Sequence, residues 1–298
     1  MTTFRIKAPA KLNIRLKVTG RREDGYHELV SIMIPVDLFD HLELDTTRGG
    51  GITFACEGLK VPRGENNLVH RAARSFFLRT GFREEISIKL IKNIPVAAGM
   101  GGGSSDAAAV LLALNEMWSG PLSFSELHKI AVELGADIPF FLTGEPCLAR
   151  GIGEILEPIK TWPKCWYVIV RPPVEVTTSW VYGNLKLILT TGEYDYIKKI
   201  LNEAPVSVPQ ILENDLERVT VATFPIIETI KKSLIQAGAQ GALMTGSGPS
   251  VFGVFPTKDQ ALSGKQHLAL QNLGDVFMAT TWSRASFSSF SSSGKQPD

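Results

Sequence analysis

The 298-residue chain has no long hydrophobic run, no paired cysteines and no excess of charge of either sign. No apolar run approaches the roughly 20 residues that a membrane-spanning helix needs, so no membrane partner is expected. Cys56, Cys147 and Cys165 are widely spaced and lack a C-x-x-C motif, so we expect buried thiols rather than disulfides or metal ligands. A net charge of +1 gives no general attraction to nucleic acid. Strand-like alternation begins at Phe4, so no leader peptide is expected, and the predicted location is the cytoplasm.

The chain does contain a glycine-rich loop that leads into a helix-forming segment. Residues 94–109 read IPVAAGMGGGSSDAAA, and residues 107–118 contain no Gly or Pro. Glycines let backbone N–H groups approach a ligand, and the first N–H groups of a helix carry the positive end of its dipole. Such a construction binds phosphate. A flexible loop with Ser104 or Ser105 as a helix N-cap would explain fewer of the glycines.

Common nucleotide-binding motifs do not fit this loop. A Walker A loop needs a lysine where this chain has a serine followed by Asp106. A dinucleotide fingerprint read from Gly99 meets Ser104 where its third glycine belongs. The H-R-D and D-F-G motifs of protein kinases are absent.

The loop resembles the central motif of the GHMP kinases, Pro-x-x-x-Gly-Leu-Gly-Ser-Ser-Ala-Ala. Those enzymes phosphorylate small molecules such as galactose, homoserine and mevalonate. The extra glycines resemble one branch, whose members phosphorylate the 2-hydroxyl of 4-diphosphocytidyl-2-C-methyl-D-erythritol in the non-mevalonate isoprenoid route. Four further segments support that branch: 8–14 (APAKLNI), 22–29 (REDGYHEL), 134–141 (LGADIPFF) and 241–252 (GALMTGSGPSVF). The resemblance covers residues 5–283.

This resemblance implies an α+β, two-domain GHMP kinase fold. A domain like ribosomal protein S5 domain 2 is expected over 1–158, and a ferredoxin-like domain over 159–283. The hydrophobic pattern predicts strands at 4–8, 42–44, 52–56 and 86–90, and helices at 68–80 and from 123 to 135. Beyond a helical insertion it predicts the order βαββαβ, with strands at 165–170, 241–245, 251–255 and 276–282 and helices at 225–237 and 258–271. The serine-rich residues 284–298 are predicted to be disordered.

The catalytic residues implied by the resemblance are Asp137 and Lys11. Taken alone, Asp137 is a turn residue after a helix, and Pro139 disfavours further helix there. Lys11 alone is a solvated surface charge. In the family, the aspartate is the general base for the acceptor hydroxyl, and the lysine pairs with it near the γ-phosphate.

The resemblance also implies binding residues. Tyr26 is expected to stack on cytosine, His27 to hydrogen-bond its edge and Tyr182 to cover its other face, whereas residues 24–27 alone predict only a β-turn. Asn13 is expected near the methylerythritol hydroxyls. The turn of Gly246, Ser247 and Gly248, by itself a hairpin turn, is expected to close over the substrate phosphates.

For ATP, the implied binding residues form one set: Asn67 (alone a helix N-cap), Pro95, Val96, Ala97, Ala98, Gly99, Met100, Gly101, Gly102, Gly103, Ser104 and Ser105. Mg²⁺ is expected with the ATP, and Ser105, or Ser104 beside it, is the predicted hydroxyl ligand.

Two other functions remain open from the sequence. One is a GHMP kinase with a different small-molecule acceptor, and the other is a catalytically silent nucleotide-binding or RNA-associated module on the same fold. Both Lys11 and Asp137 are present, which favours an enzyme. The choice between a monomer and a homodimer stays open.

Overall fold

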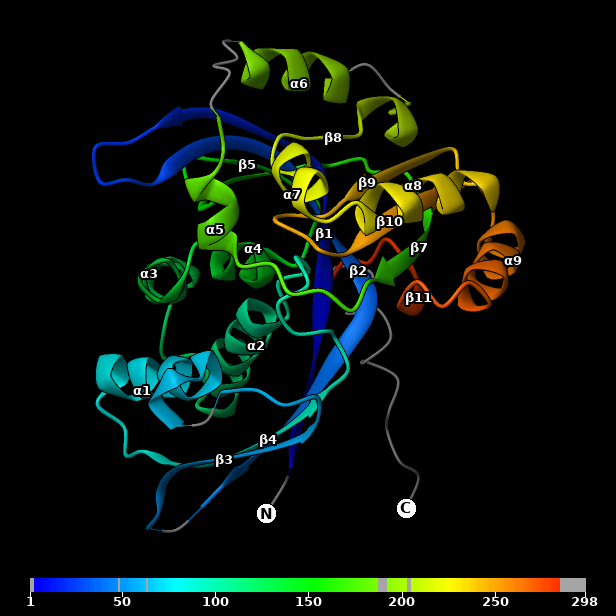
Figure 1. Cartoon of the computed structure of the whole chain (residues 1–298). Helices are drawn as coiled ribbons and strands as arrows, with labels where there is room; N and C mark the ends of the chain where they lie inside the picture. The colour runs from blue at the N-terminus through cyan, green and yellow to red at the C-terminus, as the bar shows by residue number, and fades with distance from the viewer. Residues whose placement is uncertain (1–2, 48, 63, 187–191, 203–204, 285–298) are drawn as a thin grey trace.

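The computed structural model describes residues 3–47, 49–62, 64–186, 192–202 and 205–284 (Figure 1). It is an α+β structure with two β-sheets, as predicted. The first sheet runs in the order β3-β4-β2-β1-β8; β5 joins it by pairing with β2, and β6 pairs with β5. Its strands are β1 (Phe4–Arg21), β2 (His27–Thr46), β3 (Gly51–Gly58), β4 (Glu85–Lys92), β5 (Cys147–Arg150), β6 (Ile155–Pro158) and β8 (Glu213–Asn214).

The long β1–β2 hairpin differs from the predicted short strand at 4–8. Apolar Leu12, Ile14 and Leu16 alternate with polar Lys11 and Asn13. Alternate side chains of a strand point to opposite faces, and here both faces are buried. The prediction relied on apolar residues to find strands. The polar residues Lys11 and Asn13 do not fit such a pattern, so this part of β1 was not predicted.

Four helices pack with this sheet in one apolar core: α1 (Leu68–Thr80), α2 (Gly102–Met117), α3 (Phe124–Leu134) and α4 (Ile138–Thr143). Asn67 caps α1 through Val69 N, and Gly81 ends it in the left-handed conformation at φ 75°. Ser123 forms the capping box that opens α3. These predicted ends are confirmed, because each depends on local backbone hydrogen bonds.

The helix α4 was not predicted. Pro139 falls in its first turn, where the missing proline N–H leaves no intrahelical bond unmade. Asp137 lies in the predicted turn after α3, but a short helix follows it directly.

The second sheet has the antiparallel order β11-β7-β10-β9. Its elements confirm the βαββαβ order: β7 (Trp166–Arg171), α8 (Ile226–Gln236), β9 (Gly241–Met244), β10 (Val251–Phe255), α9 (Lys258–Ala269) and β11 (Asp275–Thr280). Tyr167 and Ile169 pack against the hairpin of the first sheet, whereas Val168 and Val170 share a core with α8 and α9. The second sheet is thus buried on both faces.

The insertion between β7 and α8 is only partly helical. It contains α5 (Thr178–Gly183), α6 (Glu193–Asn202), the 3₁₀ turn Val208–Ile211 and α7 (Glu217–Thr223), but also β8. That strand pairs in parallel with β1, so the insertion returns to the first sheet. Figure 1 shows α6 beyond the hairpin and α5 near its tip. The predicted domain limit at residue 158 falls between β6 and β7 and stays a prediction.

Two smaller predictions need correction. Arg284, assigned to the disordered tail, is held by Gly144 O through its backbone N–H and by Phe141 O through its guanidinium, while residues 285–298 lie outside the described residues. Cys147 is buried, but the other two cysteines are only half-buried. In the described part of the chain, no helix is long and apolar enough to cross a membrane.

Candidate active site

A cavity of about 1220 Å³ lies where the two sheets, the glycine-rich loop and the insertion meet. Drug-sized ligands typically occupy clefts of about 300–1,000 Å³, so this cavity has room for two ligands at once. Of the predicted site residues, only Met100 and Ser105 are absent from its lining. The Met100 carbonyl instead accepts the backbone N–H of Lys11 at 3.0 Å.

Two glycines of the loop are required by close packing. Gly99 has φ 75°, and a Cβ there would lie 2.2 Å from the carbonyl oxygen of Thr245. Gly101 has φ 69°, and its Cβ would lie 2.8 Å from the ring of Phe141. Gly101 is also the N-cap of α2, so the alternative of a serine N-cap is wrong. The helix begins three residues earlier than a cap at Ser104 would place it.

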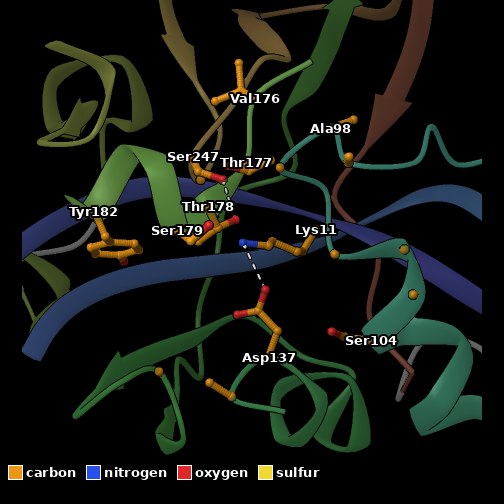
Figure 2. Close-up of a pocket in the computed structure, with 18 of the residues that line it drawn as sticks. Lys11, Ala98, Ser104, Asp137, Val176, Thr177, Thr178, Ser179, Tyr182 and Ser247 are labelled. Carbon is orange, nitrogen blue, oxygen red and sulfur yellow. Dashed lines mark hydrogen bonds and ion pairs between the residues drawn. The ribbon is translucent and has the colours of Figure 1, made fainter. Parts of the chain in front are cut away.

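Lys11 and Asp137 face each other across the cavity (Figure 2). Lys11 Nζ lies 3.5 Å from Asp137 Oδ2, and the two side chains are 6 % and 38 % exposed. The same ammonium donates to Asn13 Oδ1 at 2.5 Å. Asn13 Nδ2 in turn donates to Ser31 Oγ at 2.8 Å. In this structure Asn13 therefore positions Lys11, and its Oδ1 is already engaged.

The hairpin tip brings the predicted cytosine-binding residues to one end of the cavity. The rings of His27 and Tyr182 stack with centroids 5.0 Å apart and an interplanar angle of 27°. Tyr26 is 60 % exposed and follows the predicted turn, in which its N–H donates to Asp24 Oδ1. Burial, and then the charge of Arg21, lower the pKa of His27, which favours a neutral imidazole at pH 7.

The turn of residues 246–248 joins β9 to β10 and touches the glycine-rich loop. Thr245 Oγ1 accepts the N–H of Asn13 at 3.0 Å, and Gly246 packs against the carbonyl of Gly99. Ser247 Oγ lies 2.9 Å from Thr178 Oγ1, which links the turn to α5 (Figure 2). The two glycine segments therefore meet, although about 150 residues of sequence separate them.

Asn214 on β8 was not predicted as a site residue. Its Nδ2 donates to Met244 O and to Gly246 O, each at 2.8 Å, and its Oδ1 accepts the N–H of Leu216. The side chain is buried, and its hydrogen bonds hold the turn of residues 246–248 in place. No local motif marks an isolated asparagine for this role.

A second lysine lies beneath the glycine-rich loop and was also missed. Lys92 contacts the carboxylates of Asp40 and Asp106, and all three side chains are buried. Burial raises the pKa of Asp106; the ammonium opposes this shift and Asp40 adds to it. Burial lowers the pKa of Lys92, but the two carboxylates outweigh it and the net shift is upward.

The predicted Mg²⁺ ligand can be tested against the positions of the two serines. Ser105 is 1 % exposed and is not part of the cavity lining, whereas Ser104 lines it. Among the described residues, no group of three His, Cys, Asp or Glu side chains could hold a metal ion. The residues therefore fit an ion held mainly by phosphate oxygens, with Ser104 the better placed of the two hydroxyls.

Two protein-family models match this chain. The model of the GHMP kinases N terminal domain matches residues 67–145, and that of the GHMP kinases C terminal domain matches residues 186–271. The chain belongs to the GHMP kinase family, and it is a kinase; this family implies ATP as the phosphate donor.

Particular relatives narrow the comparison. The chain is 48 % identical over 263 residues to a 4-diphosphocytidyl-2-C-methyl-D-erythritol kinase from Syntrophotalea carbinolica, covering 88 % of this chain and 93 % of that one. It is 45 % identical to the kinase of the same name from Geobacter metallireducens, covering 93 % and 98 %. A crystal structure of 4-(cytidine 5'-diphospho)-2C-methyl-D-erythritol kinase matches with a TM-score of 0.79 at 35 % identity, over 94 % of this chain and 99 % of that one.

Proposed function

We propose that this protein transfers the γ-phosphate of ATP to the 2-hydroxyl of 4-diphosphocytidyl-2-C-methyl-D-erythritol, giving the 2-phosphate and ADP. The observation that carries the proposal is one continuous cavity with three parts. The Lys11–Asp137 pair lies between Ser104 of the glycine-rich loop on one side and Tyr182 on the other (Figure 2). His27 stacks on Tyr182. The relatives named above support the same substrate.

In this proposal, Asp137 accepts the proton of the acceptor hydroxyl. Its carboxylate is partly exposed to the cavity and has an oxygen available. The ammonium of Lys11 offsets the negative charge that develops on the transferred phosphoryl group. The first N–H groups of α2 and the glycine backbone hold the phosphates. Mg²⁺, when bound, neutralises β- and γ-phosphate charge, and the Ser104 hydroxyl would help to hold it.

Cytosine recognition is assigned to the hairpin tip and α5. The rings of His27 and Tyr182 stack on each other at this end of the cavity, which supports assigning it to a planar base. A cytosine held by Tyr26 and Tyr182 would present its edge to His27, which can both donate and accept. Asn13 remains the proposed partner of the methylerythritol hydroxyls once its contact with Lys11 is exchanged.

The identity of the acceptor has to be tested, because the fold alone does not determine it. A homoserine kinase from Cytophaga hutchinsonii shares the fold with a TM-score of 0.76 at only 19 % identity. The test measures ADP release with ATP and Mg²⁺ and compares the cytidylyl substrate with homoserine, mevalonate and galactose. We expect turnover with the cytidylyl substrate alone. Turnover with another alcohol would show that the proposed acceptor is wrong. If none of the four compounds is turned over, a catalytically silent binding module is favoured.

A further inference from the structure

Lys92, Asp40 and Asp106 form a buried charge cluster, here called the clasp, directly under the glycine-rich loop. Their side chains are 2 %, 0 % and 3 % exposed. The Lys92 ammonium contacts Asp40 Oδ2 and lies 2.8 Å from Asp106 Oδ2. Lys92 and Asp106 belong to the cavity lining, but almost none of either side chain is exposed.

The clasp touches both ends of the loop. Asp40 Oδ1 accepts the N–H groups of Asn93 at 2.6 Å and Ile94 at 2.8 Å, where the chain leaves β4. Asp106 lies early in α2, where the loop has become helix. Between these points the chain passes over the ammonium, because a Cβ on Gly102 would lie 2.7 Å from Lys92 Nζ. One ammonium therefore joins the beginning and the end of the loop.

Stability alone does not account for the third member of the clasp. Lys92 and Asp40 already form a balanced buried pair, so Asp106 adds a carboxyl that burial disfavours. Its Oδ1 has no hydrogen-bond partner among the described residues. A costly residue at the loop's helical end points to a role in the loop.

We propose that Asp106 acts through Lys92 as a positioning residue, and that the clasp holds residues 99–103 in the conformation that binds the triphosphate of ATP. This inference rests on the proposed use of the loop for ATP. Asp106 touches neither nucleotide nor acceptor in this scheme. Its removal should therefore weaken nucleotide binding without changing the acceptor end of the cavity.

The test uses variants at Asp106, because they leave the balanced Lys92–Asp40 pair in place. Asp106→Ala and Asp106→Leu both remove the contact between Asp106 and Lys92. The leucine fills the volume in case the smaller residue leaves an unstable cavity. Asp106→Asn keeps the shape and an acceptor for Lys92. Lys89→Met is the matched control, since Lys89 lies on the same strand in an exposed pair with Glu57. Urea denaturation confirms that each variant is folded.

The readouts are the KM for ATP, the KM for the acceptor, and the affinity for a fluorescent ADP analogue measured without acceptor. Asp106→Ala and Asp106→Leu are expected to raise the ATP KM and the analogue Kd about tenfold, the effect of one lost charge-assisted hydrogen bond. The acceptor KM should change less than about twofold, and Asp106→Asn should restore most of the ATP affinity.

Three results would overturn the inference: nucleotide affinity unchanged in a folded Ala or Leu variant, equal changes in both KM values, or no rescue by asparagine. Analogue binding needs no acceptor, so a wrong acceptor assignment does not affect this test. If the unsubstituted protein binds no nucleotide, the assignment of the loop to ATP fails first.

Discussion

Two lysine–aspartate groups lie against the glycine-rich loop, Lys11 beside Gly101 and Lys92 beside Gly102, and they differ in their exposure to the cavity. Lys11 faces one carboxylate at 3.5 Å, and that carboxylate is 38 % exposed to the cavity. Lys92 contacts two carboxylates, and nothing in its cluster is more than 3 % exposed. The same side-chain chemistry can thus serve a reaction in one place and hold the backbone in the other. The two groups differ in solvent access.

Asp137→Asn should have the largest effect on activity. Asparagine keeps the shape but cannot take a proton, so we expect kcat to fall by a factor of about 10² to 10⁴ while the ATP KM changes little. The free energy of unfolding should be nearly unchanged, because the side chain is partly exposed. Steady-state kinetics and urea denaturation measure both quantities.

The control for that variant is Asp259→Asn, at an exposed position in the first turn of α9. It should leave both quantities as they are. A loss of less than about threefold in kcat for Asp137→Asn would mean that another group accepts the proton.

Asp137→Asn is expected to act on activity and not on stability, whereas Lys92→Met should act mainly on stability. It leaves two buried carboxylates without their cation, so we expect unfolding to become easier by about 3–5 kcal/mol. Lys89→Met should cost no more than about 1 kcal/mol, as exposed ion pairs do. Equal destabilisation by the two variants, measured by urea denaturation, would show that the buried cluster is not the stronger of the two.

Asn214→Asp should have a smaller effect than Lys92→Met. It tests a buried side chain that holds the backbone by hydrogen bonds without carrying a charge. It removes the donor to Met244 O and Gly246 O and places a carboxylate against both carbonyls. We expect a loss of about 1–3 kcal/mol in the free energy of unfolding. The acceptor KM should rise more than the ATP KM. Asn202→Asp, at an exposed position, is the control; a matching loss there would contradict a specific role for the turn.

The smallest effect is expected at His27, through pH. Its pKa is lowered by burial and by Arg21, so the neutral ring is favoured at pH 7 and is lost as the pH falls below the ordinary pKa of histidine. The acceptor KM should stay constant from pH 8 to about 6.5 and rise below. Arg21→Gln removes the opposing charge and should move that rise to higher pH. The ATP KM, measured in parallel, should not show this pH dependence. If Arg21→Gln leaves the pH profile of the acceptor KM unchanged, His27 is not the group that causes the rise.

Features determined by neighbouring residues could be predicted from the sequence. The caps of α1 and α3 and the βαββαβ order depend on local hydrogen bonds and hydrophobic periodicity. The polar half of β1 could not be predicted this way, because the buried face of Lys11 and Asn13 has no apolar pattern. The clasp joins residues separated by 14 and 52 positions, and Asn214 reaches 32 residues along the chain. Such contacts follow from the tertiary arrangement and leave no local signature.

The β1–β2 hairpin has a consequence for how acceptor size could evolve. Lys11 pairs with Pro35 in the middle of this ribbon, and His27 pairs with Arg21 at its tip. Under the proposed function, the number of residues between these points therefore sets the spacing between the reacting hydroxyl and the cytosine. Two residues added to each strand would lengthen that spacing by about 6–7 Å and keep every side chain on its face. One added residue would turn the polar set away from the cavity. Changes in acceptor length therefore require no change in any contact residue, but they are restricted to even steps.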